Sequence, residues 1–342
     1  MFSFIPDYCF LLVFGLILLI KGGDWFVDAA SSIAKRFHLP ELLIGATVVS
    51  IGTTLPEVMT SALGAVSGSS GIAYGNAIGS IICNTSLIAA TTIAIKPGKA
   101  DKKSMIFPVI CFFAVAIFYA LNAYLAGGFA LWTGIVLLVI FVAYMIINVL
   151  NMKKNPTVPD KLCLENTEMV CIEEAEEPAE ESKAGMVKDI VMLIVGALVI
   201  AVGAYLLVEN ATIVANKLGV PESVIGLTVV ALGTSLPELV TAITSLLKGH
   251  GALSLGNIIG ANIFNLVLVS GVAITISPFT VPEGSMLFGQ NASFVLDIPV
   301  MFAVMAIMTI PTLFKGKLAR WQGISLLAIY ASYLVLQFAF VG

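Results

Sequence analysis

The chain has 342 residues, of which 59% are apolar and 11% are charged, and its formal net charge is −4. This composition, with a mean hydropathy of +1.03, excludes a soluble globular protein, and the acidic balance excludes a nucleic-acid-binding protein. Because a membrane-spanning helix needs about 20 apolar residues, the sequence predicts an all-α integral membrane protein that has the lipid bilayer as a partner and binds no nucleic acid.

Apolar runs bounded by glycine, proline and lysine predict ten transmembrane helices. In chain order they cover residues 6–36, 41–67, 71–95, 104–124, 127–150, 187–216, 222–247, 252–277, 291–312 and 321–341. We therefore expect a first five-helix repeat over residues 1–150 and a second over residues 187–342. Between them, residues 151–186 form a polar linker that holds nine of the 21 acidic residues, all between Asp160 and Glu181.

Lysine and arginine residues between the spans are unevenly distributed over the two sides of the predicted membrane. One side has only Lys217, whereas fifteen cations lie on the other: Lys35, Arg36, Lys96, Lys99, Lys102, Lys103, Lys153, Lys154, Lys161, Lys183, Lys188, Lys248, Lys315, Lys317 and Arg320. By the positive-inside rule, the richer side is cytoplasmic. We expect a multi-pass protein of the cell membrane with both termini outside and the acidic linker in the cytoplasm. The linker is expected to be disordered and solvated, with weak Ca²⁺ sensing as the alternative.

The sequence repeats itself. Residues 39–57 (LPELLIGATVVSIGTTLPE) align without a gap on residues 220–238 (VPESVIGLTVVALGTSLPE), with twelve identities in nineteen positions. The same offset of 181 pairs residues 75–84 (GNAIGSIICN) with residues 256–265 (GNIIGANIFN), with six identities in ten. A shared offset indicates an internal duplication. Because each half has an odd number of spans, the two copies must cross the membrane with opposite polarity, which is the inverted-repeat architecture of secondary transporters.

The second and seventh spans contain the matching segments GTTLPE and GTSLPE. Pro56 and Pro237 each remove a backbone N–H and clash with the preceding turn, so we predict that helices 2 and 7 are broken there. A break frees main-chain carbonyls at membrane depth, such as those of Ser50 and Ala231, and a bound cation can satisfy them. The hydroxyl groups beside the predicted breaks belong to Thr53, Thr54, Thr234 and Ser235.

Two acidic residues fall near the centres of these spans. Glu57 and Glu238 each carry a carboxylate, which costs about 2.5–3.5 kcal/mol at the centre of a membrane helix. Carboxylate, hydroxyl, amide and main-chain oxygens together form an all-oxygen set, which suits a hard cation such as Ca²⁺ or Na⁺ rather than Zn²⁺ or Cu. Two negative charges also neutralise one divalent ion.

The third and eighth spans add asparagines. We expect Asn84 and Asn265 to be cation ligands, with hydrogen bonding between helices as the alternative. Asn76 and Asn257 are expected to have a structural role, and Ser80 lies on the same helix face as Asn84 because the two are four residues apart.

Several other polar residues are not expected to bind the ion. Asp297 is an unassigned acid without a counterpart in the first half. Acids near span ends are expected to be solvated: Asp24, Asp28, Glu41, Glu209 and Glu222. The five cysteines form no CxxC pair, so we expect neither zinc nor redox chemistry and no resident cofactor.

The motifs G-T-[ST]-L-P-E and G-N-x-I-G-x-x-I-x-N, present in each half, resemble the α-repeats of the sodium/calcium exchanger family within the cation/calcium antiporter superfamily. The resemblance covers the chain outside the linker and implies antiport of Ca²⁺ against Na⁺ or H⁺ by alternating access. It also implies that the first and sixth spans slide across a core of the other eight.

The resemblance further implies a ligand set at the matching positions of this chain. Acidic ligands fall on Glu57 and Glu238, and main-chain ligands fall on Ser50 and Ala231. Hydroxyl ligands fall on Thr53, Thr54, Thr234, Ser235 and Ser80.

The chain departs from the family pattern at two points. Relatives often carry an acid at one of the positions matching Asn84 and Asn265, and potassium-dependent members carry acids at both, so potassium dependence is not expected here. Ala261 stands where sodium-driven relatives commonly offer a hydroxyl to Na⁺. Against proton coupling, the GNAxEL signature of many cation/proton exchangers is replaced by GNAIGS.

We therefore predict an antiporter that exchanges Ca²⁺ for Na⁺, with exchange of Ca²⁺ or another divalent cation for H⁺ as the alternative. A cation channel would need a continuous pore and usually a symmetric oligomer, whereas this single pseudo-symmetric chain is expected to work as a monomer. An enzyme is not expected, because no Ser/His or paired-Asp motif is present and both histidines, His38 and His250, fall in predicted turns.

Overall fold

The computed structural model describes residues 7–37, 39–68, 70–154, 183–217, 231–282, 286–287 and 289–340. The helices of the first half are α1 (Asp7–Arg36), α2 (Glu41–Ile44), η1 (Gly45–Val49), α3 (Ser50–Val66), α4 (Ser70–Cys83), η2 (Asn84–Ala89), α5 (Ala90–Ile95), α6 (Lys102–Ala126) and α7 (Leu131–Lys154). Those of the second half are α8 (Lys183–Lys217), α10 (Ala231–Thr234), α11 (Leu236–Leu247), α12 (Gly251–Phe264), η4 (Asn265–Val269), α13 (Ser270–Ile276), η5 (Ser293–Asp297), α14 (Ile298–Lys315) and α15 (Arg320–Phe340).

Within the described ranges, eight helices are long and apolar enough to cross a membrane. They correspond to eight of the ten predicted spans, namely 10–36, 41–66, 71–95, 102–126, 131–151, 185–206, 251–276 and 293–315. Of the predicted seventh span, residues 222–230 lie outside the described residues, and α11 is a shorter apolar helix. The predicted tenth span is helical as α15 but is not among the eight. The all-helical membrane fold is confirmed, whereas the count of ten stays a prediction.

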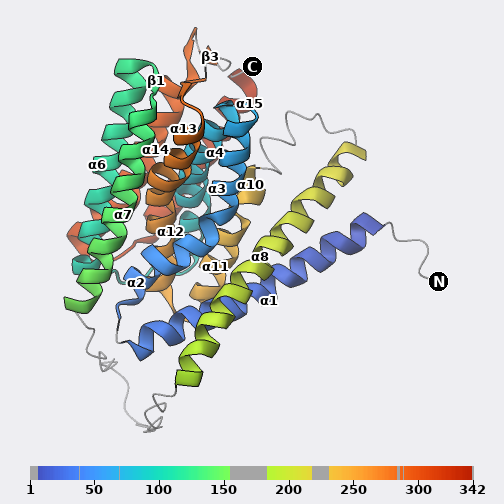
Figure 1. Ribbon diagram of the computed structural model, residues 1–342, viewed down its shortest axis with the longest axis vertical. Helices are drawn as coiled ribbons and strands as arrows, with labels where there is room; N and C mark the ends of the chain where they lie inside the picture. The colour runs from blue at the N-terminus through green and yellow to red at the C-terminus, as the bar shows by residue number, and fades with distance from the viewer. Residues whose placement is uncertain are drawn as a thin grey trace.

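The helices α1 and α8 pair with each other along one flank of the bundle, and both run obliquely to the helices beside them (Figure 1). They are the longest helices described, with 30 and 35 residues. Glycines set their close approach: a Cβ added at Gly196 would lie 2.8 Å from the backbone nitrogen of Phe26, and one at Gly203 would lie 2.8 Å from the carbonyl oxygen of Gly15. Small residues at such contacts allow membrane helices to pack backbone to backbone.

The predicted break in the second span is wrong. The helix α3 runs unbroken from Ser50 to Val66 with Pro56 inside it. Proline is tolerated within a membrane helix when neighbouring groups satisfy the backbone, and its ring meets the carbonyl of residue i−4, which here is Gly52. The seventh span is interrupted as predicted, because α10 ends at Thr234 and Ser235 forms a turn before α11.

Among the described residues, irregular helix geometry occurs instead in four π-helical segments. The segment η1 directly precedes α3, η5 precedes α14, and η2 and η4 begin at Asn84 and Asn265 respectively. A π-helical turn inserted in an α-helix is frequent at functional sites. The two asparagines thus occupy equivalent irregular positions, 181 residues apart.

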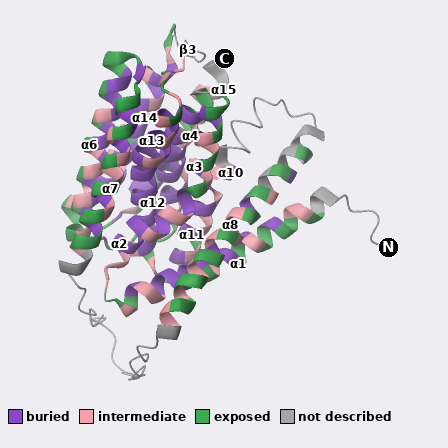
Figure 2. Cartoon of the chain, in the orientation of Figure 1, coloured by how far each residue is buried: buried purple, intermediate pink, exposed green. Residues whose placement is uncertain are grey.

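The centre of the bundle is formed around α12, in which every residue from Leu253 to Phe264 is buried. Buried residues are concentrated on this helix and its neighbours, whereas α1 and α8 expose many side chains (Figure 2). A Cβ on Gly256 would overlap the carbonyl oxygen of Leu42, and a Cβ on Gly45 would overlap that of Leu253. These glycines therefore allow α12 to pack backbone to backbone against the α2–η1 segment.

Short strands connect the ends of helices. The strands β1 (Gly128–Phe129) and β2 (Phe279–Thr280) pair antiparallel, with Gly128 opposite Thr280. The strands β3 (Met286–Leu287) and β4 (Gln290–Asn291) form a hairpin with Met286 opposite Asn291. An isolated antiparallel bridge joins Lys99 to Lys317. The β1–β2 pair and the isolated bridge each tie a connection of the first half to a connection of the second.

Candidate cation site

One face of α3 is polar although it lies inside the bundle. Ser50, Thr53, Thr54 and Glu57 follow one another at i, i+3, i+4 and i+7, the spacing that places side chains on one helix face. All four are buried, and Thr54 and Glu57 are fully buried. The sequence therefore directs three hydroxyl groups and one carboxylate into the core rather than toward lipid.

The second glutamate is presented by the interrupted seventh span. Ser235 forms the turn between α10 and α11, and Pro237 and Glu238 lie in the first turn of α11. Proline is favourable there because its missing N–H would be unsatisfied in any case, and the helix N-terminus favours a negative charge. Ser235 and Glu238 are both buried, so the break directs a carboxylate inward at a favourable electrostatic position.

The two glutamates are linked across the two halves through Thr54. Thr54 and Glu57 both lie on α3, and the Thr54 hydroxyl donates to Oε1 of Glu238 at 3.4 Å. Within the described part of the chain, neither carboxylate oxygen of Glu57 nor Oε2 of Glu238 has a hydrogen-bond partner. Buried polar groups are normally hydrogen-bonded, so these oxygens lack the partners that a folded protein usually provides.

Asn84 and Asn265 share this condition. Both side chains are fully buried, and in neither does the amide oxygen or nitrogen have a hydrogen-bond partner among the described residues. The segment η2, which Asn84 begins, packs against α11, and η4, which Asn265 begins, packs against α3. Each asparagine thus begins a segment that contacts the glutamate-bearing helix of the other half. We call Glu57, Glu238, Asn84 and Asn265 the central cluster.

Asn76 and Asn257, by contrast, are engaged in hydrogen bonds. The Thr53 hydroxyl donates to Oδ1 of Asn257 at 3.2 Å, and the Thr234 hydroxyl donates to Oδ1 of Asn76 at 3.4 Å. Each bond joins one half of the chain to the other. Thr53 and Thr234 are equivalent positions of the two repeats, 181 residues apart, and so are Asn76 and Asn257, so the two bonds are equivalent as well. We call these two bonds the crossed pairs. Such bonds are what the expected structural role of both asparagines requires.

Further hydrogen bonds hold both asparagines in place. Asn76 also donates to the main-chain oxygen of Glu57 at 3.0 Å and to the Ser61 hydroxyl at 2.8 Å. Asn257 donates to the Thr241 hydroxyl at 2.9 Å. Sequence analysis missed the crossing between the halves, although the shared offset was a signal that could have indicated it.

Three further predicted ligands, Ser50, Ser80 and Ala231, lie on α3, α4 and α10 respectively. The Ser50 hydroxyl donates to the main-chain oxygens of Gly45, at 2.7 Å, and Asn257, at 2.9 Å. Ser80 is buried on α4, and Ala231 is the first residue of α10. The ligand roles predicted for these three residues therefore stay a proposal.

Several acids outside the central cluster have protein partners. Lys248 contacts Asp24 at 3.3 Å and Asp28 at 2.8 Å, and His250 Nδ1 lies 2.7 Å from Glu41. These contacts join α1 and α2 to the α11–α12 turn. Oδ1 of Asp297 accepts hydrogen bonds from Tyr333, at 3.0 Å, and Gln337, at 2.8 Å.

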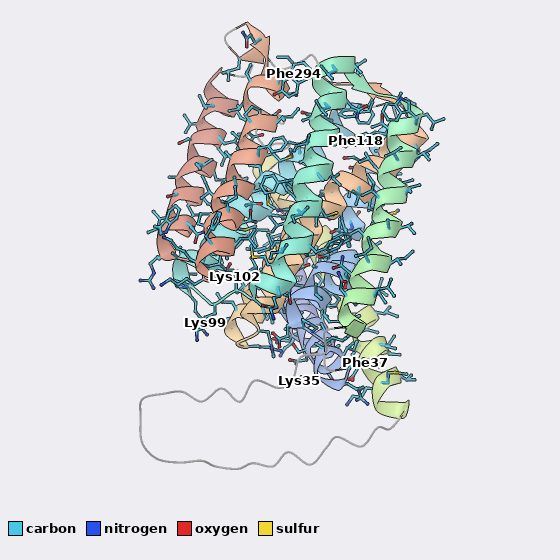
Figure 3. All side chains as sticks on the ribbon, turned by 90° about the vertical axis from the view of Figure 1, so that its left-hand side faces the viewer. Lys35, Phe37, Lys99, Lys102, Phe118 and Phe294 are labelled. Carbon is cyan, nitrogen blue, oxygen red and sulfur yellow. The ribbon has the colours of Figure 1, made fainter. Side chains whose placement is uncertain are left out.

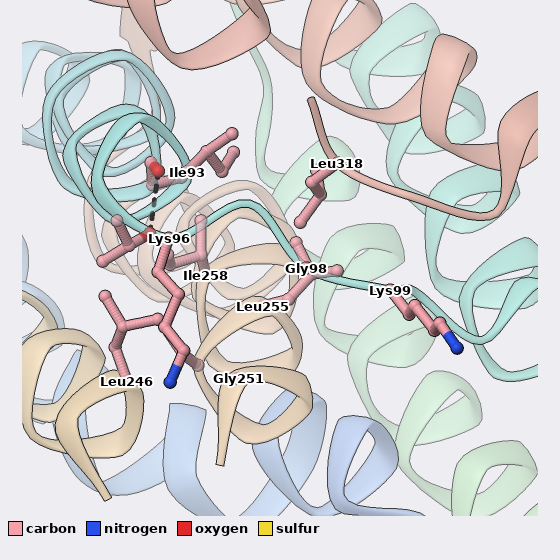
Figure 4. A pocket seen from close by; sticks show the side chains of 12 residues that line it. Ile93, Lys96, Gly98, Lys99, Leu246, Gly251, Leu255, Ile258 and Leu318 are labelled. Carbon is pink, nitrogen blue, oxygen red and sulfur yellow. Dashed lines mark hydrogen bonds between the residues drawn. The ribbon is translucent and has the colours of Figure 1, made fainter. Parts of the chain in front are cut away.

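A pocket lies between the end of α5 and the start of α12, lined in part by Lys96, Leu246 and Leu318 (Figure 4). None of its lining residues belongs to the central cluster. It is therefore not part of the candidate cation site.

Comparisons with known proteins identify the family of the chain. The family model described as "Sodium/calcium exchanger protein" matches residues 8–150 and 188–339. The sodium/calcium exchanger MaX1 of Methanosarcina acetivorans is 34% identical over 96% of this chain and 97% of its own length. The inner membrane protein YrbG of Escherichia coli is 32% identical over 86% of this chain and 87% of its own length.

The fold also matches a solved structure. The sodium-calcium exchanger NCX_Mj soaked with Na⁺ and Sr²⁺ is 31% identical, with a TM-score of 0.76, and the match covers 96% of this chain and 98% of that one. Family match, full-length relatives and fold agree, and the chain belongs to the sodium/calcium exchanger family of multi-pass membrane transporters.

Proposed function

We propose that this protein is a secondary active antiporter that exchanges Ca²⁺ for Na⁺ by alternating access. The observation that carries the proposal is the central cluster, in which both carboxylate oxygens of Glu57, Oε2 of Glu238 and two buried amides lack hydrogen-bond partners in the described part of the chain. An unpaired buried carboxylate is costly, and a cation bound between the two halves would supply the missing partner. The cargo is a metal ion, so no enzymatic step and no resident cofactor is required.

Both cargo ions would use overlapping oxygens. Ca²⁺ would bind between Glu57 and Glu238, with amide and hydroxyl oxygens replacing water, which matches the all-oxygen sets that hard cations prefer. Na⁺ would occupy the same region in the other half of the cycle. The unloaded site carries two negative charges in a medium of low dielectric constant, so it would not cross the membrane easily. That barrier would couple the two fluxes.

The full proposed ligand set extends beyond the central cluster. Hydroxyl groups and main-chain oxygens would complete the coordination at Ser50, Thr53, Thr54, Ser80, Ala231, Thr234 and Ser235. Thr54 is supported by its hydrogen bond to Glu238. The others are proposed from their matching positions in the two repeats.

The proposed architecture has two inverted five-helix repeats, over residues 1–150 and 187–342, working as a monomer. The crossed pairs support it, because the same Thr–Asn contact occurs once in each direction between the repeats. The glycine-lined pairing of α1 with α8 supports a unit that moves as one against the remaining helices. We place the protein in the cell membrane with both termini outside and the linker in the cytoplasm. In agreement, Lys35, Lys99 and Lys102 lie toward one end of the molecule and Phe294 lies at the other (Figure 3).

A proton-driven exchange is the second candidate. It is favoured by Ala261, which is fully buried and offers no hydroxyl at the position equivalent to Ser80. One Na⁺ ligand is thereby absent, whereas protons would need only the carboxylates of Glu57 and Glu238.

Uptake of radiolabelled Ca²⁺ into proteoliposomes tests the proposal. Vesicles containing purified protein are prepared with an outward Na⁺ gradient, an outward H⁺ gradient or no gradient. Uptake driven by Na⁺ alone supports Na⁺/Ca²⁺ exchange, and uptake driven by H⁺ alone assigns the protein to proton coupling. Uptake without either gradient would indicate a channel and would contradict both forms of the proposal.

A further inference from the structure

Exposed cations gather where two connections of the molecule meet. The α5–α6 and α14–α15 connections are joined by main-chain hydrogen bonds, from Ala100 to the oxygen of Gly316 at 3.0 Å and from Leu318 to the oxygen of Gly98 at 2.8 Å. We call this junction the basic joint. Its seven cations, all exposed, are Lys96, Lys99, Lys102, Lys103, Lys315, Lys317 and Arg320.

The basic joint lacks compensating acids in the described part of the chain. None of its cations forms an ion pair there, whereas Arg36 and Lys248, at other connections, are both paired with acids. Lys102 and Arg320 donate to main-chain carbonyls, which carry no net charge. The acid of the joint, Asp101, already accepts hydrogen bonds from the N–H groups at the start of α6.

The fold itself does not require these charges. Lys99 and Lys317 lie directly opposite each other in an antiparallel bridge, where like charges are destabilising. The equivalent joint of the duplicated fold is the β1–β2 pair, in which Thr280 stands 181 residues after Lys99 and pairs with Gly128. That joint forms without a charged pair. A bound anion would relieve the repulsion between the two lysines.

The pocket between α5 and α12 opens at the basic joint. Lys96 and Lys99 line it together with apolar side chains that include Leu246 and Leu255 (Figure 4). The adjoining hollow shares both lysines and Leu246 and has a volume of about 230 Å³. A Cβ added at Gly251, which lines both, would meet no atom within 4 Å. The lysines therefore border open space that has an apolar wall.

Exposed apolar side chains border the same cations. Ile95, which is 66% exposed, ends one membrane span and precedes Lys96. Phe314, which is 78% exposed, precedes Lys315 at the end of another span. Apolar and cationic surfaces thus meet here as acyl chains and headgroups meet at a membrane interface. A free phosphate would use the cations alone, whereas a phospholipid would use both surfaces.

We propose that the basic joint binds the phosphate of an anionic phospholipid. Lys96 and Lys99 would contact the headgroup, since lysine binds phosphate as a point charge, and the acyl chains would lie along the exposed ends of α5 and α14. This site is separate from the central cluster and does not depend on which ions are exchanged. Each lysine near the membrane surface should strengthen binding of an anionic lipid about fivefold.

Native mass spectrometry of the purified full-length protein in detergent tests the proposal. The protein is titrated separately with phosphatidylglycerol, with phosphatidylcholine, which has no net charge, and with inorganic phosphate. We expect saturable binding of phosphatidylglycerol at least about fivefold tighter than that of phosphatidylcholine, and no saturable binding of phosphate. Equal affinity for the two lipids would overturn the proposal. Phosphate that binds as tightly as phosphatidylglycerol would overturn the lipid as occupant.

Variants of exposed lysines locate the site. Lys96→Gln combined with Lys99→Gln should weaken phosphatidylglycerol binding about 25-fold, fivefold for each lysine. The matched control combines Lys35→Gln with Lys188→Gln, two exposed lysines of α1 and α8, and should bind as the unchanged protein does. Lys35 lies toward the same end of the molecule as Lys99 (Figure 3). Equal weakening in both double variants would show attraction by net charge alone and would overturn the site.

The acidic linker is the other occupant that charge alone would permit. A full-length variant in which the nine acids between Asp160 and Glu181 are replaced by their amides separates it from lipid. If phosphatidylglycerol occupies the basic joint, its affinity should not depend on these acids. Binding of phosphatidylglycerol that occurs only after the acids are removed would show that the linker covers the joint and would overturn the proposal.

Discussion

The two copies of the G-T-[ST]-L-P-E motif have nearly the same sequence but different local structures. In the first copy, Pro56 and Glu57 lie inside the continuous helix α3. In the second, Ser235 interrupts the helix, and Glu238 lies in the first turn of α11. Because the residues are almost identical, backbone propensity does not decide between the two forms, and the packing around each copy does.

The difference has a functional meaning in a protein built from repeats. If both copies had the same conformation, the two sides of the membrane would be equally open or equally closed to the site between them. One continuous and one interrupted copy instead make the halves inequivalent. We expect the opposite state of the transport cycle to exchange the two conformations, because equivalent residues are available in each half.

The largest expected effect comes from removing either charge of the site. Glu57→Gln and Glu238→Gln should each abolish gradient-driven Ca²⁺ uptake, because each variant leaves one carboxylate to balance a divalent ion. Asp297→Asn, which changes an acid outside the central cluster, is the matched control and should transport. Retained uptake in both glutamine variants would contradict the site assignment and would make the contrast between the two motif copies irrelevant to transport.

The second effect concerns the crossed pairs. Asn257 is buried and accepts from Thr53 and donates to Thr241, so Asn257→Ala should lower the free energy of unfolding by about 1–3 kcal/mol. Asn76 is only partly buried, and water can replace its lost bonds, so Asn76→Ala should cost about 0.5–1.5 kcal/mol. Denaturation of the purified variants in detergent measures both. Equal losses would show that the two halves are more alike in packing than their burial indicates.

The third effect compares the two prolines. A proline in a helix interior costs up to about 3 kcal/mol. In a membrane helix, neighbouring groups satisfy part of the backbone that the proline frees, here near Gly52. Pro56→Ala should therefore stabilise the continuous form of α3 by only about 1 kcal/mol. Pro237 lies in the first turn of α11, where proline is favourable, so Pro237→Ala should leave stability nearly unchanged.

Transport should respond in the opposite sense to stability. If α3 must open at Pro56 during the cycle, Pro56→Ala should slow Ca²⁺ uptake while raising the melting temperature. A faster or unchanged rate in this variant would show that the first motif copy does not change shape during transport.

Sequence reasoning predicted ten spans, of which eight are found among the described helices. It also predicted a break at Pro237, and the helix is interrupted two residues earlier, at Ser235. Hydropathy and proline chemistry are local signals, so both could be read from the sequence. Sequence reasoning failed at Pro56, where tertiary packing keeps α3 continuous. It also missed the π-helical segments beginning at Asn84 and Asn265. A π-helical turn changes the register of a helix by one residue without changing which residues are apolar, so hydrophobic periodicity does not reveal it. Both misses concern backbone geometry next to the candidate ligands, where packing between the repeats outweighs local preference.

The smallest expected effect concerns the ion pairs at the end of the second copy. Lys248 follows α11 and binds Asp24 and Asp28 of α1, whereas the equivalent position in the first copy is the uncharged Ser67. The side chains of Asp24 and Asp28 are 38% and 65% exposed, so solvent screens the attraction, and Lys248→Ala should cost no more than about 1 kcal/mol. Because only one repeat is tied to α1 in this way, the variant should alter the Ca²⁺ uptake rate measurably at low ionic strength and less at high salt. An effect that does not diminish with salt would show that the lysine contributes by packing rather than by charge.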